Sequence, residues 1–323
     1  MAVSCCLLPV TEVSATAPLR VCHGDQYNVI GLPFVPSVIT SSGRVAGTTE
    51  AHRAALWEPH SGLRELRVPD GFRFTDPVAI KKSGEVVVNA LDAQSHKRRS
   101  FVYSKDAAIA LAGNQTLAHG MSASGVIVGE WVPEGATRSD PVYWGNNLPR
   151  SLGLCCGGTL KAANEAGEMV GDAYDEQGRY HAFAWSLSRG ERRVGPSDGY
   201  SSAVTINEAG HILIQVAREA YLDEGGTLRR LELSPTLYNS VLAMNNCDSV
   251  VGGYGTDSDH YRAFSWTPTA GFRDLNSLVP ATSGWTLEFA TAINDRGEIV
   301  GRGIFHDDES GFLLIPRPRS TPH

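Results

Sequence analysis

His119 and Lys161 are the two residues of this chain whose types and positions could support acid–base chemistry. Each lies six residues before a glycine of a repeated motif, Gly125 and Gly167. An imidazole can act as a general base, and an ammonium can stabilise a developing negative charge. The equivalent position in the other copies carries no ionisable side chain: it holds Ser37, Val78, Val204, Leu242 or Thr291. We predict that His119 and Lys161 are catalytic, with hydrogen-bonded structural roles as the alternative.

Six further residues are predicted to bind a ligand near this pair. They are acidic or aromatic and are expected at the same end of the fold: Asp76, Trp131, Asp172, Tyr174, Trp285 and Glu288. Asp76 and Glu288 are expected at the level of His119 and Lys161. Acidic loops elsewhere, such as 307–309, could bind a metal through their carboxylates, but nothing in the sequence fixes their geometry. We predict no cofactor and no metal.

The familiar catalytic signatures are absent from the sequence. It contains no Gly-x-Ser-x-Gly, no Gly-x-x-x-x-Gly-Lys, no His-Glu-x-x-His and no Cys-x-x-Cys. His181 occupies a position where two other copies carry Arg53 and Arg262, so we interpret it as a structural hydrogen-bonding residue. The aromatic residues that recur at the same spacing are interpreted as core residues.

The elements that must position these residues come from a sevenfold repeat. In six copies a glycine, here called the anchor, follows a short apolar segment and often an Asn; these glycines are at 43, 84, 125, 167, 210 and 297. In the sixth copy along the chain Asp248 replaces the glycine. Successive anchors are roughly 40–50 residues apart, which is the period of a four-stranded propeller blade. We predict an all-β fold, a seven-bladed β-propeller with four-stranded antiparallel blades. The anchors are expected to be turn residues with positive φ.

The two ends of the chain predict how the ring closes. The segment 27–34 looks like a strand with no blade before it, and the seventh copy has no fourth strand after Pro316. We predict that this N-terminal strand completes the seventh blade, so that no sheet edge is left exposed. The predicted organisation is an arm or peripheral strand at 1–26, the propeller at 27–316 and a disordered tail at 317–323.

Three segments resemble the HAF-repeat family, which is named for a His-Ala-Phe motif. They are Ala-Ile-Asn-Asp-Arg-Gly-Glu-Ile-Val-Gly at 292–301, His-Ala-Phe-Ala-Trp at 181–185, and the segment 274–287 with its Trp285. The resemblance covers 27–316, and copies two and five depart from it, for example with Lys81 in place of the Asn. It implies a propeller, a bacterial protein and often export, with no generally assigned chemistry.

Composition excludes several other classes. The formal net charge is −7 and no basic run exceeds Lys97-Arg98-Arg99, which argues against nucleic-acid binding. No apolar run approaches the roughly 18 residues that span a bilayer, so no membrane association is predicted. The N-terminal segment has no cationic residue before Arg20 and therefore does not resemble a secretory signal. From the sequence we expect a cytoplasmic protein, whereas the family resemblance implies an exported mature form.

The six cysteines suggest no obvious disulfide framework. Cys5-Cys6 and Cys155-Cys156 are adjacent pairs, which are awkward disulfide partners for each other, and Cys22 and Cys247 remain. We expect reduced thiols.

Two functions from different classes remain open. The first is a small-molecule-processing propeller of the lyase, cyclase or hydrolase type, with its site at the mouth of the central channel. The second is a non-catalytic binding module that presents its top face to a protein, peptide or glycan. Loops on a rigid scaffold carry function in either case. A deep polar site favours the enzyme, whereas a flat apolar patch favours the binding module.

Overall fold

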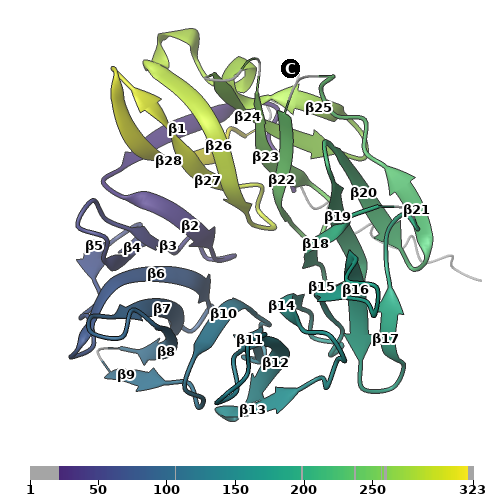
Figure 1. The fold of residues 1–323 in the computed structure, drawn as a ribbon. Coiled ribbons are helices and arrows are strands. Elements are labelled where there is room, and N and C mark those ends of the chain that lie inside the picture. The colour runs from purple at the N-terminus through teal and green to yellow at the C-terminus, as the bar shows by residue number, and fades with distance from the viewer. Residues whose placement is uncertain are drawn as a thin grey trace, which may run out of the picture.

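The computed structural model describes residues 22–318, apart from residues 106, 198, 236–237, 256 and 258–259. The described strands form seven four-stranded antiparallel sheets arranged around a common axis (Figure 1). The predicted seven-bladed β-propeller is confirmed. Besides the strands, the described residues include two short 3₁₀ turns, η1 (Leu275–Leu278) and η2 (Ala281–Ser283). Among the described residues, no helix has the length and apolar character needed to cross a membrane.

The blades follow one another along the chain, and each begins with its innermost strand. Blade 1 holds β2 (Val35–Ile39), β3 (Val45–Thr48), β4 (Ala54–Glu58) and β5 (Gly62–Glu65); blade 2 holds β6 (Phe72–Ile80), β7 (Val86–Asp92), β8 (Arg98–Ser104) and β9 (Ala107–Ala110). Blade 3 holds β10 (Thr116–Met121), β11 (Ile127–Trp131), β12 (Asp140–Gly145) and β13 (Leu148–Ser151); blade 4 holds β14 (Gly158–Ala163), β15 (Met169–Tyr174), β16 (Tyr180–Ser186) and β17 (Gly190–Arg193). Blade 5 holds β18 (Ser202–Ile206), β19 (His211–Val216), β20 (Glu219–Glu224) and β21 (Thr227–Arg230); blade 6 holds β22 (Tyr238–Met244), β23 (Val250–Gly255), β24 (Tyr261–Thr267) and β25 (Gly271–Asp274).

Blade 7 closes the ring with strands from both ends of the chain. It combines β26 (Trp285–Ile293), β27 (Ile299–Phe305) and β28 (Asp308–Pro316) with the N-terminal strand β1 (Tyr27–Leu32). Strand β1 pairs with β28 from Tyr27 opposite Pro316 to Leu32 opposite Gly311. The predicted ring closure is confirmed. Residues 1–21 of the predicted arm and 319–323 of the predicted tail lie outside the described residues.

Seven buried clusters hold the blades together, one between each pair of neighbouring blades. The cluster between blades 2 and 3, for example, packs Val87 and Leu111 against Ile127, Val142 and Trp144. Residues alternate between the two faces of a strand, so each central strand contributes to the clusters on both sides of its blade. Burial of apolar surface between sheets is therefore the main force that fixes the position of each inner strand.

The anchors are the turn residues between the first and second strand of each blade. Gly125, Gly167 and Gly297 have φ of 100°, 77° and 71°, and Asp248 in the same position has φ of 57°. Positive φ is accessible to glycine at little cost. The prediction that the anchors occupy left-handed turn positions is confirmed.

The Asn before an anchor links its blade to the next one. The carboxamide nitrogens of Asn164, Asn207, Asn245 and Asn294 each donate to a backbone carbonyl of the following blade's turn, at 3.2, 3.4, 3.0 and 2.8 Å. Each carboxamide oxygen accepts a backbone N–H of its own turn. This row of bonds, here called the asparagine belt, runs from blade 4 through blades 5, 6 and 7 to Thr40 in blade 1. The repeated Asn is therefore a structural residue.

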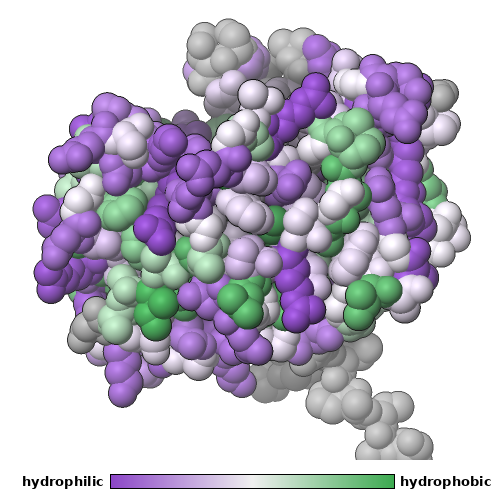
Figure 2. Space-filling model, turned by 60° about the horizontal axis from the view of Figure 1, so that its bottom comes forward, coloured by the Kyte–Doolittle hydropathy of each residue, from purple (hydrophilic) through white to green (hydrophobic). Residues whose placement is uncertain are grey.

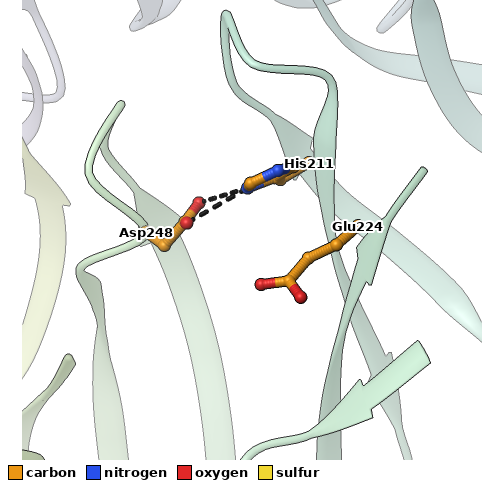
Figure 3. A group of neighbouring side chains, drawn as sticks. All are labelled: His211, Glu224 and Asp248. Carbon is orange, nitrogen blue, oxygen red and sulfur yellow. Dashed lines mark hydrogen bonds and ion pairs between the residues drawn. The ribbon is translucent and has the colours of Figure 1, made fainter. Parts of the chain in front are cut away.

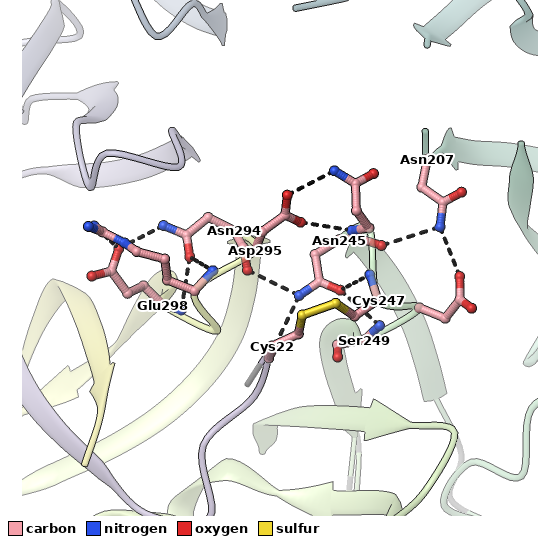
Figure 4. Close-up of a disulfide and its surroundings, with 11 residues drawn as sticks. Cys22, Asn207, Asn245, Cys247, Ser249, Asn294, Asp295 and Glu298 are labelled. Carbon is pink, nitrogen blue, oxygen red and sulfur yellow. Dashed lines mark hydrogen bonds and ion pairs between the residues drawn. A yellow bond between two sulfur atoms is a disulfide. The ribbon is translucent and has the colours of Figure 1, made fainter. Parts of the chain in front are cut away.

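The expectation of reduced thiols is wrong for two of the cysteines. Cys22 and Cys247 form a disulfide between the segment that precedes β1 and the anchor turn of blade 6 (Figure 4). The two residues are 225 positions apart in the sequence, so their proximity depends on ring closure, which brings the N-terminus back to the last blades. Cys155 and Cys156 form no disulfide and carry free thiols.

Candidate functional site

His119 and Lys161 are the bulge residues of their inner strands. In every blade the register between the first and second strand shifts at the residue six positions before the anchor. A bulge adds one residue that has no partner in the ladder and changes the direction of its side chain. These bulge residues are half-buried or exposed although their strands are innermost. The position at which the copies differ is thus a solvent-accessible place near the propeller axis.

Lys161 is paired with a fully buried carboxylate. Its ammonium forms an ion pair with Asp172 on β15 and donates to the Ser202 hydroxyl of blade 5 at 2.6 Å. The side chain of Lys161 is 27% exposed and that of Asp172 is 0% exposed. Burying a carboxylate costs free energy unless it is paired and hydrogen-bonded. Lys161 therefore supports the fold of blade 4, a role that the comparison of copies did not reveal.

Asp172 accepts three further hydrogen bonds that fix its orientation. The Tyr180 hydroxyl donates at 2.6 Å, the Ser202 hydroxyl at 3.1 Å and the Ala203 backbone N–H at 2.8 Å. Burial raises the pKa of Tyr180, and its hydrogen bond to Asp172 raises it further. Tyr180 is therefore a protonated hydroxyl at neutral pH. Its hydroxyl and the Lys161 ammonium both contact the Asp172 carboxylate.

His119 is surrounded by groups of both charges. Burial lowers the pKa of His119 from 6.5; the Glu130 carboxylate opposes this effect and the Lys161 ammonium adds to it, with smaller contributions from Asp172 and Arg98. Burial disfavours the charged form of an imidazole. His119 is accordingly neutral at neutral pH, which is the form in which an imidazole can accept a proton.

Glu130 and Tyr180 were not found from the sequence, although the repeat carries a signal for Glu130. Glu130 and Asp172 both lie five residues after their anchors, where Asn89 and Gln215 stand in blades 2 and 5. Asn89, Asp172 and Gln215 each accept a backbone N–H from the next blade's inner strand, at 3.1, 2.8 and 3.0 Å. The Glu130 carboxylate makes no hydrogen bond or ion pair with any described residue. Comparison of the copies at this second position would have identified it.

We call His119, Lys161, Glu130, Asp172 and Tyr180 the axial cluster. Tyr174 borders it, since its ring lies 5.0 Å from that of Tyr180. Tyr174 is 44% exposed and lines a cavity of about 450 Å³ together with Arg138 and Cys156. Of the predicted binding residues, Asp172 and Tyr174 are thus brought together with the predicted catalytic pair.

The two other acidic residues predicted to bind a ligand contact groups outside the axial cluster. Asp76 lines a separate cavity of about 290 Å³ with Arg98 and Asn89. Glu288 lies on blade 7, with its carboxylate 3.7 Å from the Arg302 guanidinium. Among the described residues, neither Asp76 nor Glu288 forms a hydrogen bond or ion pair with His119 or Lys161.

The two tryptophans predicted to bind a ligand pack against other apolar side chains. Trp131 packs against the buried cluster between blades 2 and 3. Trp285 stacks on Phe305 at 5.0 Å between ring centroids and meets Phe312 edge-on at 6.0 Å. Both tryptophans are half-buried in these contacts, and their role in binding a ligand stays a prediction.

Among the described residues, the acidic loops do not gather into a metal site near the axis. Asp175, for example, accepts the backbone N–H groups of Gln177 and Arg179 in its own loop, and these bonds lower its pKa. Within the described part of the chain, one group of side chains has the composition and spacing of metal ligands: His211, Glu224 and Asp248. It contains no member of the axial cluster.

Comparisons with solved structures support the fold. A catalytically inactive histidine-to-alanine variant of virginiamycin B lyase from Staphylococcus aureus, solved with quinupristin, is similar with a TM-score of 0.61 and 11% identity over 90% of this chain and 100% of that chain. A putative TolB from Agrobacterium tumefaciens has a TM-score of 0.52 and 13% identity over 79% of this chain and 94% of that one. A puromycin hydrolase variant has a TM-score of 0.55 and 12% identity over 84% of this chain and 50% of that one.

No model of a known protein family and no curated protein matches the chain. The resemblance to the HAF-repeat family therefore stays an expectation from the sequence. At such low identity the solved structures establish the propeller fold alone.

Proposed function

We propose that the protein binds a small polar molecule at the axial cluster and processes it by acid–base chemistry of the lyase or hydrolase type. The observation that carries this proposal is the neutral His119 imidazole, which stands among Glu130, Lys161 and Arg98 at a bulge that folding does not require to be ionisable. Propeller neighbours include a streptogramin B lyase and a puromycin hydrolase, so the fold is compatible with both reaction types.

The groups of the cluster divide into three roles. His119 would accept a proton from the substrate or from an attacking water, and Glu130 would favour the imidazolium that forms. The Lys161 ammonium would stabilise negative charge that develops on the substrate. The His119 imidazolium would return the same proton to a leaving atom, and Tyr180, whose hydroxyl donates to Asp172, would hold that carboxylate in place beside Lys161.

Figure 2 supports a small-molecule site over a protein-docking surface on the side of the molecule that it displays. Hydrophobic residues there form separate small areas among hydrophilic ones. A docking surface for a protein typically offers a continuous apolar patch of several hundred Å².

The proposal is tested by screening small polar metabolites for a shift in melting temperature and following each hit for turnover by mass spectrometry. His119→Gln should lower kcat by about 100-fold or more while the melting temperature at pH 7.5 stays close to that of the wild type. Ser37→Ala, at the same bulge position in blade 1, is the matched control and should keep full turnover.

Full turnover by the His119→Gln variant would contradict the assignment of the general base. A hit that binds tightly without any turnover, and whose affinity depends on His119, would instead assign the protein to the non-catalytic binding class.

A further inference from the structure

His211, Glu224 and Asp248 bring three potential metal ligands together at the junction of blades 5 and 6. One ligand atom from each residue lies within 4.8 Å of the others. His211 begins β19, Glu224 ends β20 directly opposite it in the ladder, and Asp248 is the anchor of blade 6. In Figure 3 the His211 ring faces the Asp248 carboxylate, and the Glu224 carboxylate extends toward the same space. All three side chains are half-buried.

Comparison of the seven copies indicates that folding alone does not require this group. The anchor is glycine in the six other copies and Asp only here, in a left-handed backbone that disfavours a side chain. The residue after the anchor is His only in blade 5. In blade 1 the equivalent pair is Arg44 and Glu58, an ordinary ion pair at 2.6 Å. Two residues unusual for the repeat therefore meet a third potential ligand at one place.

Neighbouring groups hold the carboxylates in position and leave acceptor atoms available. His211 Nδ1 lies 2.9 and 3.1 Å from the two carboxylate oxygens of Asp248. The Asn207 carboxamide donates to Asp248 Oδ1 at 2.8 Å, and the Arg229 guanidinium donates to Glu224 Oε1 at 2.8 Å. Hydrogen bonds of this kind orient metal-binding carboxylates. With a neutral imidazole, the two carboxylates and Arg229 sum to one negative charge, which favours a cation.

We propose that His211, Glu224 and Asp248 bind a divalent transition metal of the Zn²⁺ class. One imidazole nitrogen and two carboxylate oxygens form a mixed nitrogen and oxygen ligand set, which suits Zn²⁺ better than Mg²⁺ or Ca²⁺ because those ions prefer oxygen ligands alone. Three protein ligands leave a coordination position for water. The metal joins blade 5 to blade 6, and the site is independent of the axial cluster and of the function proposed for it.

The test is calorimetric titration of the untagged, EDTA-treated protein with ZnCl₂. All samples carry Ser in place of Cys5, Cys6, Cys155 and Cys156, so that zinc bound by thiols outside the disulfide is not counted. We expect about one zinc per chain, and an affinity at least about 10-fold lower after His211→Gln or Asp248→Gly. Asp248→Gly restores the residue of the six other copies, so this variant should fold at least as well as the wild type in EDTA. His60→Gln, at an exposed histidine elsewhere, is the control and should bind as the wild type does.

Two outcomes would overturn the proposal. The first is a failure of the wild-type chain to bind zinc in the titration. The second is zinc binding of unchanged affinity by a folded Asp248→Gly variant, with folding checked by its melting curve in EDTA. Neither outcome affects the acid–base proposal, which uses no residue of this group.

Discussion

At the residue scale, the ion pair of Lys161 with Asp172 decides what a substitution in the axial cluster does. Comparison of the copies suggested that an ionisable residue at the bulge is dispensable for folding, and this holds for the position in general. For Lys161 it does not hold, because the neighbouring second strand carries a carboxylate that is fully buried. Removal of one partner leaves the other charge without compensation.

Lys161→Met should lower the free energy of unfolding by about 2–3 kcal/mol, less than for a fully buried pair because the lysine is partly exposed. The double variant Lys161→Met/Asp172→Asn should regain most of this loss, since the amide oxygen still accepts the Ala203 N–H. Urea denaturation of the three proteins provides the measurement. Equal stability of the wild type and the single variant would mean that the ion pair contributes nothing to the fold.

The pKa of His119 makes stability depend on pH in a defined direction. Burial places the folded-state pKa below 6.5, the value expected in the unfolded chain. Below pH 6.5 the unfolded chain therefore binds more protons than the native state, and stability falls as the pH falls. The melting temperature of the wild type should drop more between pH 7.5 and pH 5 than that of His119→Gln. His60→Gln serves as the control and should follow the wild type; an identical drop in all three proteins would contradict the lowered pKa.

At the scale of the elements, each blade is tied to its neighbour by the turn between its first two strands. Asn245 is a clear example, because its carboxamide nitrogen donates to Asn294 O and Cys22 O, and its oxygen accepts the N–H groups of Cys247 and Ser249. One buried side chain thus completes the hydrogen bonds of three segments. Buried backbone groups that lose their partners cost more free energy than a hydrogen bond gains.

Asn245→Ala should therefore destabilise the protein by about 2–4 kcal/mol. Asn246→Ala, at the exposed neighbouring position, is the matched control and should cost about 1 kcal/mol or less. Thermal and urea unfolding of both variants test the difference. Equal losses in the two variants would show that the asparagine belt does not act through burial.

At the scale of the whole molecule, the N-terminal segment is fastened to two different blades. Strand β1 completes blade 7, and the disulfide of Cys22 ties the preceding residues to blade 6. The backbone of His23 packs directly on Gly297. A β-carbon added at Gly297 would lie only 2.8 Å from the His23 backbone. Closure of the ring therefore combines a strand ladder, a covalent bond and a close backbone contact.

Replacement of both Cys22 and Cys247 by Ser should lower the free energy of unfolding by about 2–4 kcal/mol, because the cross-link restricts the unfolded chain. A reducing agent should lower the melting temperature of the wild type and leave that of the double variant unchanged. The Cys155→Ser/Cys156→Ser variant is the control and should respond to the reducing agent as the wild type does. Alkylation of Cys22 and Cys247 in the unreduced protein would contradict the disulfide.

The sequence by itself determined the propeller, the number of blades, the turn position of the anchors and the closing strand. These features depend on local patterns that recur seven times, such as apolar strands and residues that tolerate positive φ, so each copy supports the assignment of the others. It also singled out His119 and Lys161, because the copies served as controls for one another. What only the tertiary structure decided are the contacts between blades: the pairing of Lys161 and Ser202 with Asp172, the meeting of His211 with Asp248, and the disulfide of Cys22 with Cys247. Such contacts join residues far apart in the sequence, and the packing of neighbouring sheets around the axis, which no local pattern encodes, determines which side chains meet.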